Sequence, residues 1–333
     1  MSKTIHARQS HIAFILPYFG QFKEYFPLFL TSAKHNPSID WLVFTDCAEK
    51  YNWPSNVHIH HESFEDFSNR IRSIFPFEIS LEKPYKLCDY KPAYGEALQS
   101  LLSEYDFWGY CDCDLILGDL RKFLTEDILQ TNDKLFTRGH MTLFRNTPEV
   151  NAFYRTQTVK PLREVYTSGR SFSFDEWAGI SSIWEQQGRK YYDQLIMDDI
   201  RVGLEGLSPT KTISGIGGPY HPHNVNEASK YRRMRHIVYS YRDGTLKRNW
   251  LQDGKCFCEE VLYVHLQKRA MSVEDGLLNA DEFLIRDGCF IRYCDINKDN
   301  IKHLSGEKFS IHNIKFILKG RLRRAVERFL KQA

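Results

Sequence analysis

Three short segments near the start of the chain limit its fold more than any other feature. Residues 11–16 (HIAFIL) form an apolar run that ends at Pro17, residues 22–34 repeat apolar side chains at helical spacing, and residues 41–45 (WLVFT) form a second apolar run. Two buried strands joined by an amphipathic helix are typical of a parallel sheet with crossover helices. We therefore expect an α/β fold, with a Rossmann-type mixed and mostly parallel sheet flanked by helices.

The same patterns continue along the chain and define one large domain. Residues 105–117 contain an apolar strand that runs into a sharp polar turn. Further strands are predicted at residues 57–60, 134–138, 141–145, 236–241 and 260–266, and helices at residues 94–102, 148–155 and 176–187. We expect a single domain over residues 1–305 and a basic, amphipathic helical extension over residues 306–333.

Composition narrows the class of protein. The 333 residues are 42% hydrophobic and 26% charged, which is ordinary for a globular protein, and the net charge of +3 is too small for a protein that follows nucleic-acid phosphates. Residues 1–11 lack the apolar stretch of a secretion signal, and no segment has the roughly 18–20 apolar residues of a membrane span. These features predict a cytoplasmic protein that binds no nucleic acid and whose eight cysteines are thiols.

Two carboxylates follow the apolar strand of residues 107–111. Asp112 and Asp114 are two residues apart, so on an extended segment their side chains point the same way, while Cys111 and Cys113 point the other way. Paired carboxylate oxygens suit a hard cation such as Mn²⁺ or Mg²⁺ and leave coordination positions for phosphate oxygens and water. Alternatively, the pair belongs to a solvated turn or a helix cap, but its position after a buried strand favours a metal site.

The cysteines offer a competing metal site. Cys111-x-Cys113 and Cys256-x-Cys258 together supply four thiols. Structural zinc sites usually have two or more residues between paired cysteines, so the spacing argues against this interpretation. We expect buried, inert thiols instead.

Four motifs in the chain resemble a known class of enzymes. They are residues 16–20 (LPYFG), 44–46 (FTD), 86–95 (KLCDYKPAYG) and the Asp-Cys-Asp turn at 112–114. Over most of its length the chain resembles the GT-A class of nucleotide-sugar glycosyltransferases, and more closely bacterial proteins associated with capsule and surface polysaccharide synthesis. The resemblance implies a GT-A-like fold, a nucleoside-diphosphate sugar as donor and a glycan or lipid-linked saccharide as acceptor.

The resemblance also implies a donor site at the strand ends. It would put Pro17, Tyr18 and Asp46 around the nucleoside. The residues expected near the ribose, the phosphates or the metal-bound diphosphate are Lys86, Asp89, Lys91, Asp112 and Lys268. Alternatively, Lys86, Asp89 and Lys91 form a solvated charge cluster, and Asp46 caps the turn that follows it.

A late histidine often completes the metal site in GT-A enzymes, and His265 has a basic residue three positions on, Lys268. The resemblance therefore implies that His265 binds the metal with Asp112 and Asp114, and that Lys268 neutralises the departing diphosphate. Some related families have a glycine and a longer spacer between these two residues. His221 and His223 are rival ligands, and a structural role for His265 is the alternative.

An inverting transferase also needs a base to take the proton of the acceptor hydroxyl. Asp175 and Glu176 lie among aromatic residues in the segment 172–177 (FSFDEW), a setting suited to an acceptor sugar. The alternative is that Asp175 caps a helix over residues 176–187. Asp198 and Asp199 are second candidates for the base.

The tail suggests where the protein works. Residues 315–331 alternate apolar side chains with lysines and arginines, as in a helix that lies on an anionic membrane surface. We expect weak, peripheral contact with the inner face of the cell membrane, or else a helix docked on the domain. Functional alternatives to a transferase are a non-catalytic carbohydrate-binding or scaffold protein, a sugar-phosphate nucleotidyltransferase and a nucleotide-sugar hydrolase.

Overall fold

The computed structural model describes residues 8–156, 162–194, 196–203, 206–209, 234–267 and 270–306. These residues form two compact units. The first unit comprises the described residues up to Cys113 and those from Asp119 to Gln194, and the second comprises Asp114–Gly118 and the described residues from 196 onwards. The chain therefore passes from one unit to the other between Cys113 and Asp114, within the Asp-Cys-Asp turn.

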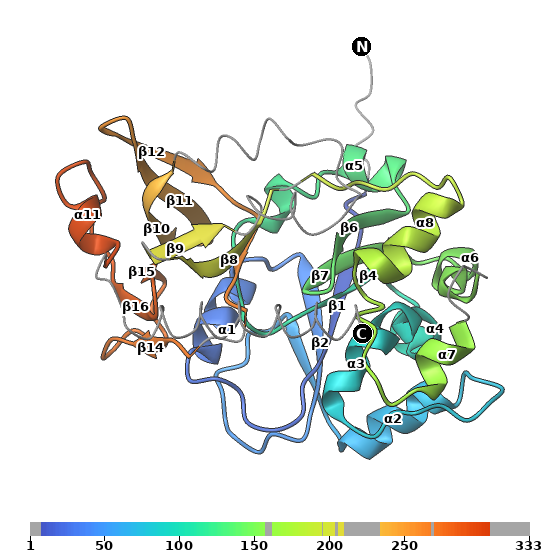
Figure 1. The fold of residues 1–333 in the computed structure, drawn as a ribbon. Coiled ribbons are helices and arrows are strands. Elements are labelled where there is room, and N and C mark those ends of the chain that lie inside the picture. Colours follow the sequence, from blue (N-terminus) through green and yellow to red (C-terminus); the bar gives the residue numbers. More distant parts are fainter. Residues whose placement is uncertain are drawn as a thin grey trace, which may run out of the picture. The chain divides into compact units, whose positions relative to one another are not determined.

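The first unit is built on a six-stranded sheet with the order β3-β2-β1-β4-β7-β6 (Figure 1). Strands β3, β2, β1 and β4 are parallel to one another, and β7 and β6 are antiparallel to their neighbours. The strands are β1 (Ile12–Pro17), β2 (Ile39–Thr45), β3 (Val57–His61), β4 (Phe107–Cys111), β6 (Lys134–Arg138) and β7 (Met141–Arg145). The predicted mixed, mostly parallel α/β sheet is confirmed.

Eight described α-helices belong to this unit, and most are short. They are α1 (Phe26–Lys34), α2 (Phe64–Arg72), α3 (Leu87–Tyr90), α4 (Tyr94–Ala97), α5 (Glu126–Thr131), α6 (Pro148–Asn151), α7 (Leu162–Thr167) and α8 (Ser182–Gln186). Pro27 lies in the first turn of α1, where a proline is tolerated, so the helix begins later than predicted.

Three predicted helices are interrupted. Residues 94–102 form α4 and then the 3₁₀ turn Gln99–Leu101, and residues 148–155 form α6 and then the 3₁₀ turn Phe153–Arg155. The predicted helix over residues 176–187 is the π-helical turn Trp177–Ser181 followed by α8, because Gly179 has non-helical dihedral angles (φ −110°, ψ −114°).

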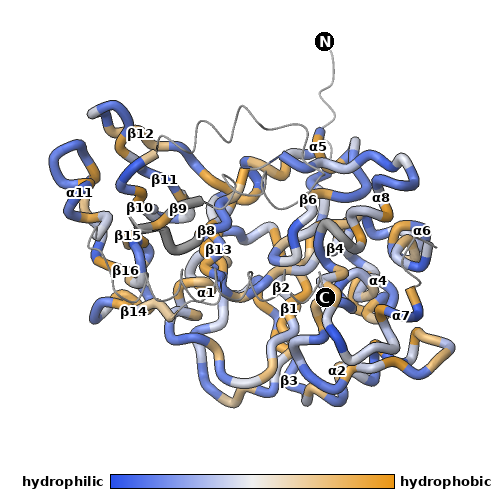
Figure 2. The backbone as a smooth tube through the Cα atoms, viewed as in Figure 1, coloured by the Kyte–Doolittle hydropathy of each residue, from blue (hydrophilic) through white to orange (hydrophobic). Residues whose placement is uncertain are grey.

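Both faces of this sheet are covered. Ala13 and Ile15 of β1 face a core that includes side chains of α2, α3, α4, α7 and α8. On the other face, Phe14 stacks on Trp41 of β2, and Trp41 contacts Phe29 of α1 edge to face. This double burial explains the apolar runs at residues 12–16 of β1 and 42–44 of β2. Figure 2 colours the backbone by hydropathy, with hydrophobic residues in orange.

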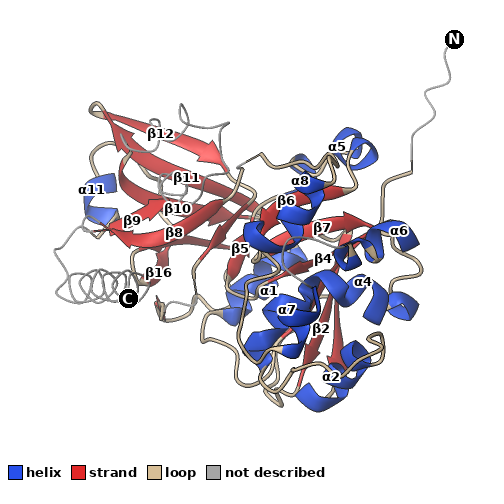
Figure 3. Ribbon diagram, turned by 45° about the vertical axis from the view of Figure 1, so that its right-hand side comes forward, coloured by secondary structure: helices blue, strands red, loops and turns tan. Residues whose placement is uncertain are grey.

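The second unit is built mainly of strands (Figure 3). One sheet has the order β12-β11-β10-β15-β16-β14, and the other has the order β5-β13-β8-β9. Their strands are β5 (Leu115–Leu117), β8 (Asp198–Gly203), β9 (Gly206–Pro209), β10 (Arg235–Arg242), β11 (Thr245–Gln252), β12 (Lys255–Glu260), β13 (Tyr263–His265), β14 (Ser272–Val273), β15 (Glu282–Arg286) and β16 (Cys289–Arg292). Helix α11 (Ile301–Leu304) packs its Ile301 against Val238 and Leu284 of the six-stranded sheet.

Three further predictions concern the cysteines, a membrane span and the C-terminal extension. Cys111 and Cys113 are buried thiols as predicted, but Cys258 is exposed because it lies on β12, an edge strand. No described helix is long and apolar enough to cross a membrane. The predicted amphipathic extension lies outside the described residues from 307 onwards.

Candidate functional site

Strand pairing in the second unit brings three predicted site residues together. β13 lies between β5 and β8, so its last residue, His265, is opposite Leu115 on one side and beside Asp199 on the other. Asp114 directly precedes Leu115, and its carbonyl accepts a hydrogen bond from the Leu266 N–H at 2.9 Å. The carboxylates of Asp114 and Asp199 therefore flank the imidazole of His265.

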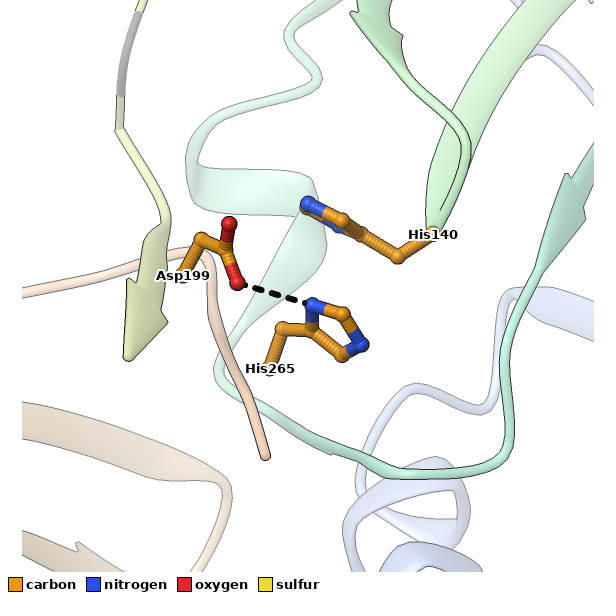
Figure 4. A group of neighbouring side chains, drawn as sticks. All are labelled: His140, Asp199 and His265. Atoms are coloured by element: carbon orange, nitrogen blue, oxygen red, sulfur yellow. Dashed lines mark hydrogen bonds and ion pairs between the residues drawn. The ribbon is translucent and has the colours of Figure 1, made fainter. Parts of the chain in front are cut away.

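The side-chain geometry fixes the orientation of that ring. His265 Nδ1 lies 3.0 Å from Asp199 Oδ1 (Figure 4), and His265 Nε2 lies 3.4 Å from Asp114 Oδ1. Gln267 Nε2 donates to Asp199 Oδ1 at 2.6 Å. A carboxylate that receives one ring N–H selects the tautomer whose other nitrogen can bind a metal. Asp199 thus directs Nε2 of His265 toward Asp114.

The electrostatics of this cluster suit a cation. Burial lowers the pKa of His265, but its hydrogen bonds to Asp114 and Asp199 and the charges of both carboxylates outweigh this effect and raise the pKa to about 10. Without another cation the imidazole therefore carries the positive charge itself. A divalent ion would take the place of that proton. One imidazole nitrogen together with carboxylate oxygens fits Mn²⁺, and fits Mg²⁺ less well because Mg²⁺ prefers oxygen ligands.

A second cluster lies in the first unit around Lys91. Lys91 Nζ is 2.7 Å from Asp112 Oδ1, 3.1 Å from Asp175 Oδ2 and 2.7 Å from the carbonyl oxygen of Gly139. The lysine is 12% exposed and the Asp112 side chain 26%, whereas the Asp175 side chain is only 5% exposed. One buried ammonium group therefore holds two of the predicted site residues.

The environment of this second cluster shifts the pKa values of Lys91 and Asp175. Burial lowers the pKa of Lys91, but Asp112 and Asp175 outweigh it and hold this pKa well above its ordinary range. Burial raises the pKa of Asp175 to about 6, although Lys91 acts in the opposite direction. Gly139 is required here, since a Cβ atom at this position would lie 2.6 Å from Asp175 Oδ2.

Lys86 and Asp89 have a different environment from the one predicted. Lys86 Nζ donates to Asp89 Oδ2 and to the carbonyls of Val165 and Arg170, at 2.7, 2.8 and 2.6 Å. Asp89 also accepts from the N–H groups of Phe172 and Phe174. The side chains of Lys86 and Asp89 are 5% and 0% exposed, so neither the solvated cluster nor direct contact with a ribose or phosphate fits this geometry.

The three residues expected around a nucleoside lie at the carboxyl ends of β1 and β2. Pro17 ends β1 opposite Phe44, and the Tyr18 N–H donates to the Phe44 carbonyl at 2.8 Å. Asp46 Oδ1 accepts from the Gly20 N–H at 2.7 Å, which ties the two strand ends together. Gly20 has φ +100°, a conformation that favours glycine.

The other candidates divide into three groups. Glu176 is exposed, in contrast to its neighbour Asp175, whose carboxylate pairs with Lys91. Asp198, predicted as a second base candidate, is buried against Arg248. The remaining candidates, which lie outside the described residues, are His221, His223 and Lys268.

The sequence did not identify several residues that shape the site. Asp199 was considered only as a base, whereas it is the partner of His265, because the register of β8 against β13 is not visible in the sequence. Gly139 and Arg248 belong to none of the motifs that the sequence analysis identified. Gln267 could have been noted, since it lies two residues after His265 on a strand end.

Two structures of the protein LgtC are among the solved structures that match this chain. A structure of an active-site mutant of LgtC matches with a TM-score of 0.40 and 11% identity, covering 78% of this chain and 88% of that chain. A structure of the galactosyltransferase LgtC in complex with donor and acceptor sugar analogues matches with a TM-score of 0.39 and 10% identity, covering 88% of this chain and 95% of that chain. No curated protein matches the sequence significantly.

One family profile also matches the sequence. It is described as "Family of unknown function (DUF6625)" and covers residues 14–294, which include both clusters and the strand ends of β1 and β2. Because the match spans well over half of the chain, the protein belongs to this family of unknown function.

Proposed function

We propose that this protein is a metal-dependent glycosyltransferase that moves a sugar from a nucleoside-diphosphate sugar to a glycan or lipid-linked acceptor. The observation that carries the proposal is the His265 ring, which Asp199 holds with its Nε2 atom 3.4 Å from Asp114 Oδ1. An oriented histidine beside a carboxylate is a typical arrangement for binding a divalent ion. Asp114 is also the second carboxylate of the Asp-x-Asp turn, the motif expected to face a diphosphate.

Asp114 and His265 would hold Mn²⁺ or Mg²⁺, joined by Asp112 two residues earlier in the chain. A divalent ion bound to a diphosphate offsets the negative charge that develops as the nucleoside diphosphate leaves. In this proposal Lys91 positions one of the ligands, since its ammonium group holds the carboxylate of Asp112 at 2.7 Å. Lys268 is the further cation that the sequence suggests for the diphosphate.

The strand ends of β1 and β2 are the proposed nucleoside site. Pro17, Tyr18 and Asp46 lie at the carboxyl edge of a parallel sheet, where ligands bind in open α/β folds. Lys86 and Asp89 support the site indirectly in this proposal, because they bind the backbone of residues 165–174 just before Asp175.

Asp175 and Glu176 are the proposed base candidates for the acceptor hydroxyl. A general base works best when its pKa lies near the working pH, and the pKa of Asp175, raised by burial to about 6, approaches that condition. Glu176 is the more exposed of the two carboxylates. The proposed acceptor is a saccharide of surface or capsule polysaccharide assembly, handled at the inner face of the membrane.

The proposal is tested by titrating UDP, GDP and CDP into the protein with and without Mn²⁺, by calorimetry, on the wild type and on Asp114→Ala. We expect one nucleotide to bind only when both Mn²⁺ and Asp114 are present. Binding of none of the three nucleotides would overturn the transferase and favour a scaffold. Nucleotide-sugar turnover assayed with and without a saccharide acceptor then separates transfer from simple hydrolysis.

A further inference from the structure

Arg248 connects the two sheets of the second unit. It lies on β11 in the six-stranded sheet, and its Nη1 atom is 2.6 and 2.7 Å from the two carboxylate oxygens of Asp198 on β8. Its Nη2 atom donates to Glu259 Oε2 on the neighbouring strand β12 at 2.8 Å. The Arg248 and Asp198 side chains are 1% and 0% exposed.

The position of Asp198 gives this ion pair a consequence at the candidate metal site. Asp198 and Asp199 are consecutive residues of β8 and pair with Val264 and His265 of β13. Successive side chains on a strand point to opposite faces. Arg248 thus holds Asp198 on one face of β8, and this contact adds to the pairing of β8 with β13 and β9 in keeping Asp199, on the other face, directed at His265.

The choice of arginine fits this task. A planar guanidinium group can bind two carboxylates at once through its two terminal nitrogens, whereas a lysine offers one point charge on a flexible stem. Burying charges is costly unless they are paired, so a buried ion pair is better explained by the geometry it enforces than by the stability it adds.

We propose that Arg248 is a positioning residue for metal binding, which acts through Asp198 and Asp199 on the orientation of His265. The inference rests on the proposed metal-dependent function. In this proposal the six-stranded sheet of the second unit, through Arg248 on β11, holds β8 in place from the face opposite the histidine. Neither Arg248 nor Asp198 contacts the ion in this proposal.

The test measures Mn²⁺ binding alone, from the electron paramagnetic resonance signal of free Mn²⁺, without nucleotide or sugar. Outer-shell partners of metal ligands typically change metal affinity by about 10–100-fold, so we expect Asp199→Asn to weaken Mn²⁺ binding within that range. The paired variant Arg248→Met/Asp198→Leu, which leaves no lone buried charge, should weaken it by roughly threefold to tenfold. Arg248→Lys is the second variant, because it keeps the charge and loses the bridge.

The spin-echo modulation from the imidazole nitrogen of His265 on bound Mn²⁺ separates positioning from general stability. We expect this modulation to decrease in both Arg248 variants at a temperature where circular dichroism shows them folded. Arg242→Met is the matched control, since Arg242 pairs with Glu282 on the same sheet and is about half exposed.

Each outcome bears on a different claim. Wild-type Mn²⁺ affinity and nitrogen modulation in the folded Arg248 variants would overturn the positioning role and leave the proposed function standing. Failure of the wild type to bind Mn²⁺ would overturn both. An equal loss in Arg242→Met would also overturn the positioning role, because it would trace the effect to the sheet as a whole.

Discussion

Asp112 and Asp114 are the same residue type two positions apart, yet the two units give them different partners. Asp112 lies 2.7 Å from the ammonium group of Lys91, and Asp114 lies 3.4 Å from His265 Nε2. A protonated lysine has no lone pair to offer a metal, whereas a histidine can exchange its proton for one. The partner, more than the carboxylate, therefore decides what each aspartate can do.

The comparison extends to the supporting residues. Around Lys91, two carboxylates share one permanent cation, so removing the cation leaves like charges together. Around His265, two carboxylates face a group whose charge is replaceable. The first cluster should respond mainly in stability and the second mainly in metal affinity, and the variants below test that division.

The largest effect is expected from Lys91→Met. Removing one partner of a buried ion pair typically costs roughly 3–5 kcal/mol, and here two carboxylates, one of them 5% exposed, would lose their common cation. Urea unfolding at pH 7 measures the change. Adding Asp175→Asn should recover part of the lost stability, because it removes one of the two opposed charges. A cost below about 1 kcal/mol would contradict the role of Lys91 as the shared counter-charge.

Asp114→Asn should produce the next largest effect, in Mn²⁺ affinity. We expect a loss of about 100-fold, or about 2.7 kcal/mol, since the variant removes a carboxylate facing His265 Nε2. Asp112→Asn is the matched comparison and should weaken Mn²⁺ binding by only about tenfold, because Lys91 already neutralises this carboxylate. Calorimetric titration of Mn²⁺ into both variants measures the two losses of affinity. Equal losses would remove the distinction between the two aspartates.

Gly139→Ala should destabilise the first cluster by about 2 kcal/mol, the usual size of an overpacking penalty. The new Cβ atom would lie 2.6 Å from Asp175 Oδ2, and Lys91 restrains that carboxylate. Gly169→Ala is the control, because its nearest neighbour, Ser80 Oγ, is 3.5 Å away. Thermal unfolding of both variants measures the difference, and an equally tolerated Gly139→Ala would mean that Asp175 is free to move.

The smallest effect is a pH dependence caused by Asp175. Its pKa rises from 3.8 to about 6 on folding, so between these values the folded state binds more protons than the unfolded state and stability falls as the pH rises. The expected loss is about 1 kcal/mol between pH 5 and pH 6. Asp175→Asn should remove this slope, which urea unfolding across that pH range would reveal. An unchanged slope would assign the pH dependence to another group.

Much of the fold could be predicted because its signals are local. The apolar runs of β1 and β2 and the short strand-like segments of β6 and β7 predicted these strands at nearly their observed bounds. The predicted helices were less accurate where one residue breaks the pattern, as Gly179 does, since a single dihedral change is not visible in apolar spacing.

The sequence by itself determined the order of many helices and strands along the chain and the position of the Asp-x-Asp turn after a buried strand, because each depends on residues within a few positions of one another. His265 was a candidate ligand only because the chain resembles GT-A enzymes. Only the tertiary structure decided the partners. Lys91 meets Asp175, and His265 meets Asp114, through pairings between segments far apart in the sequence. Strand register and side-chain packing set those distances, and no local pattern encodes them.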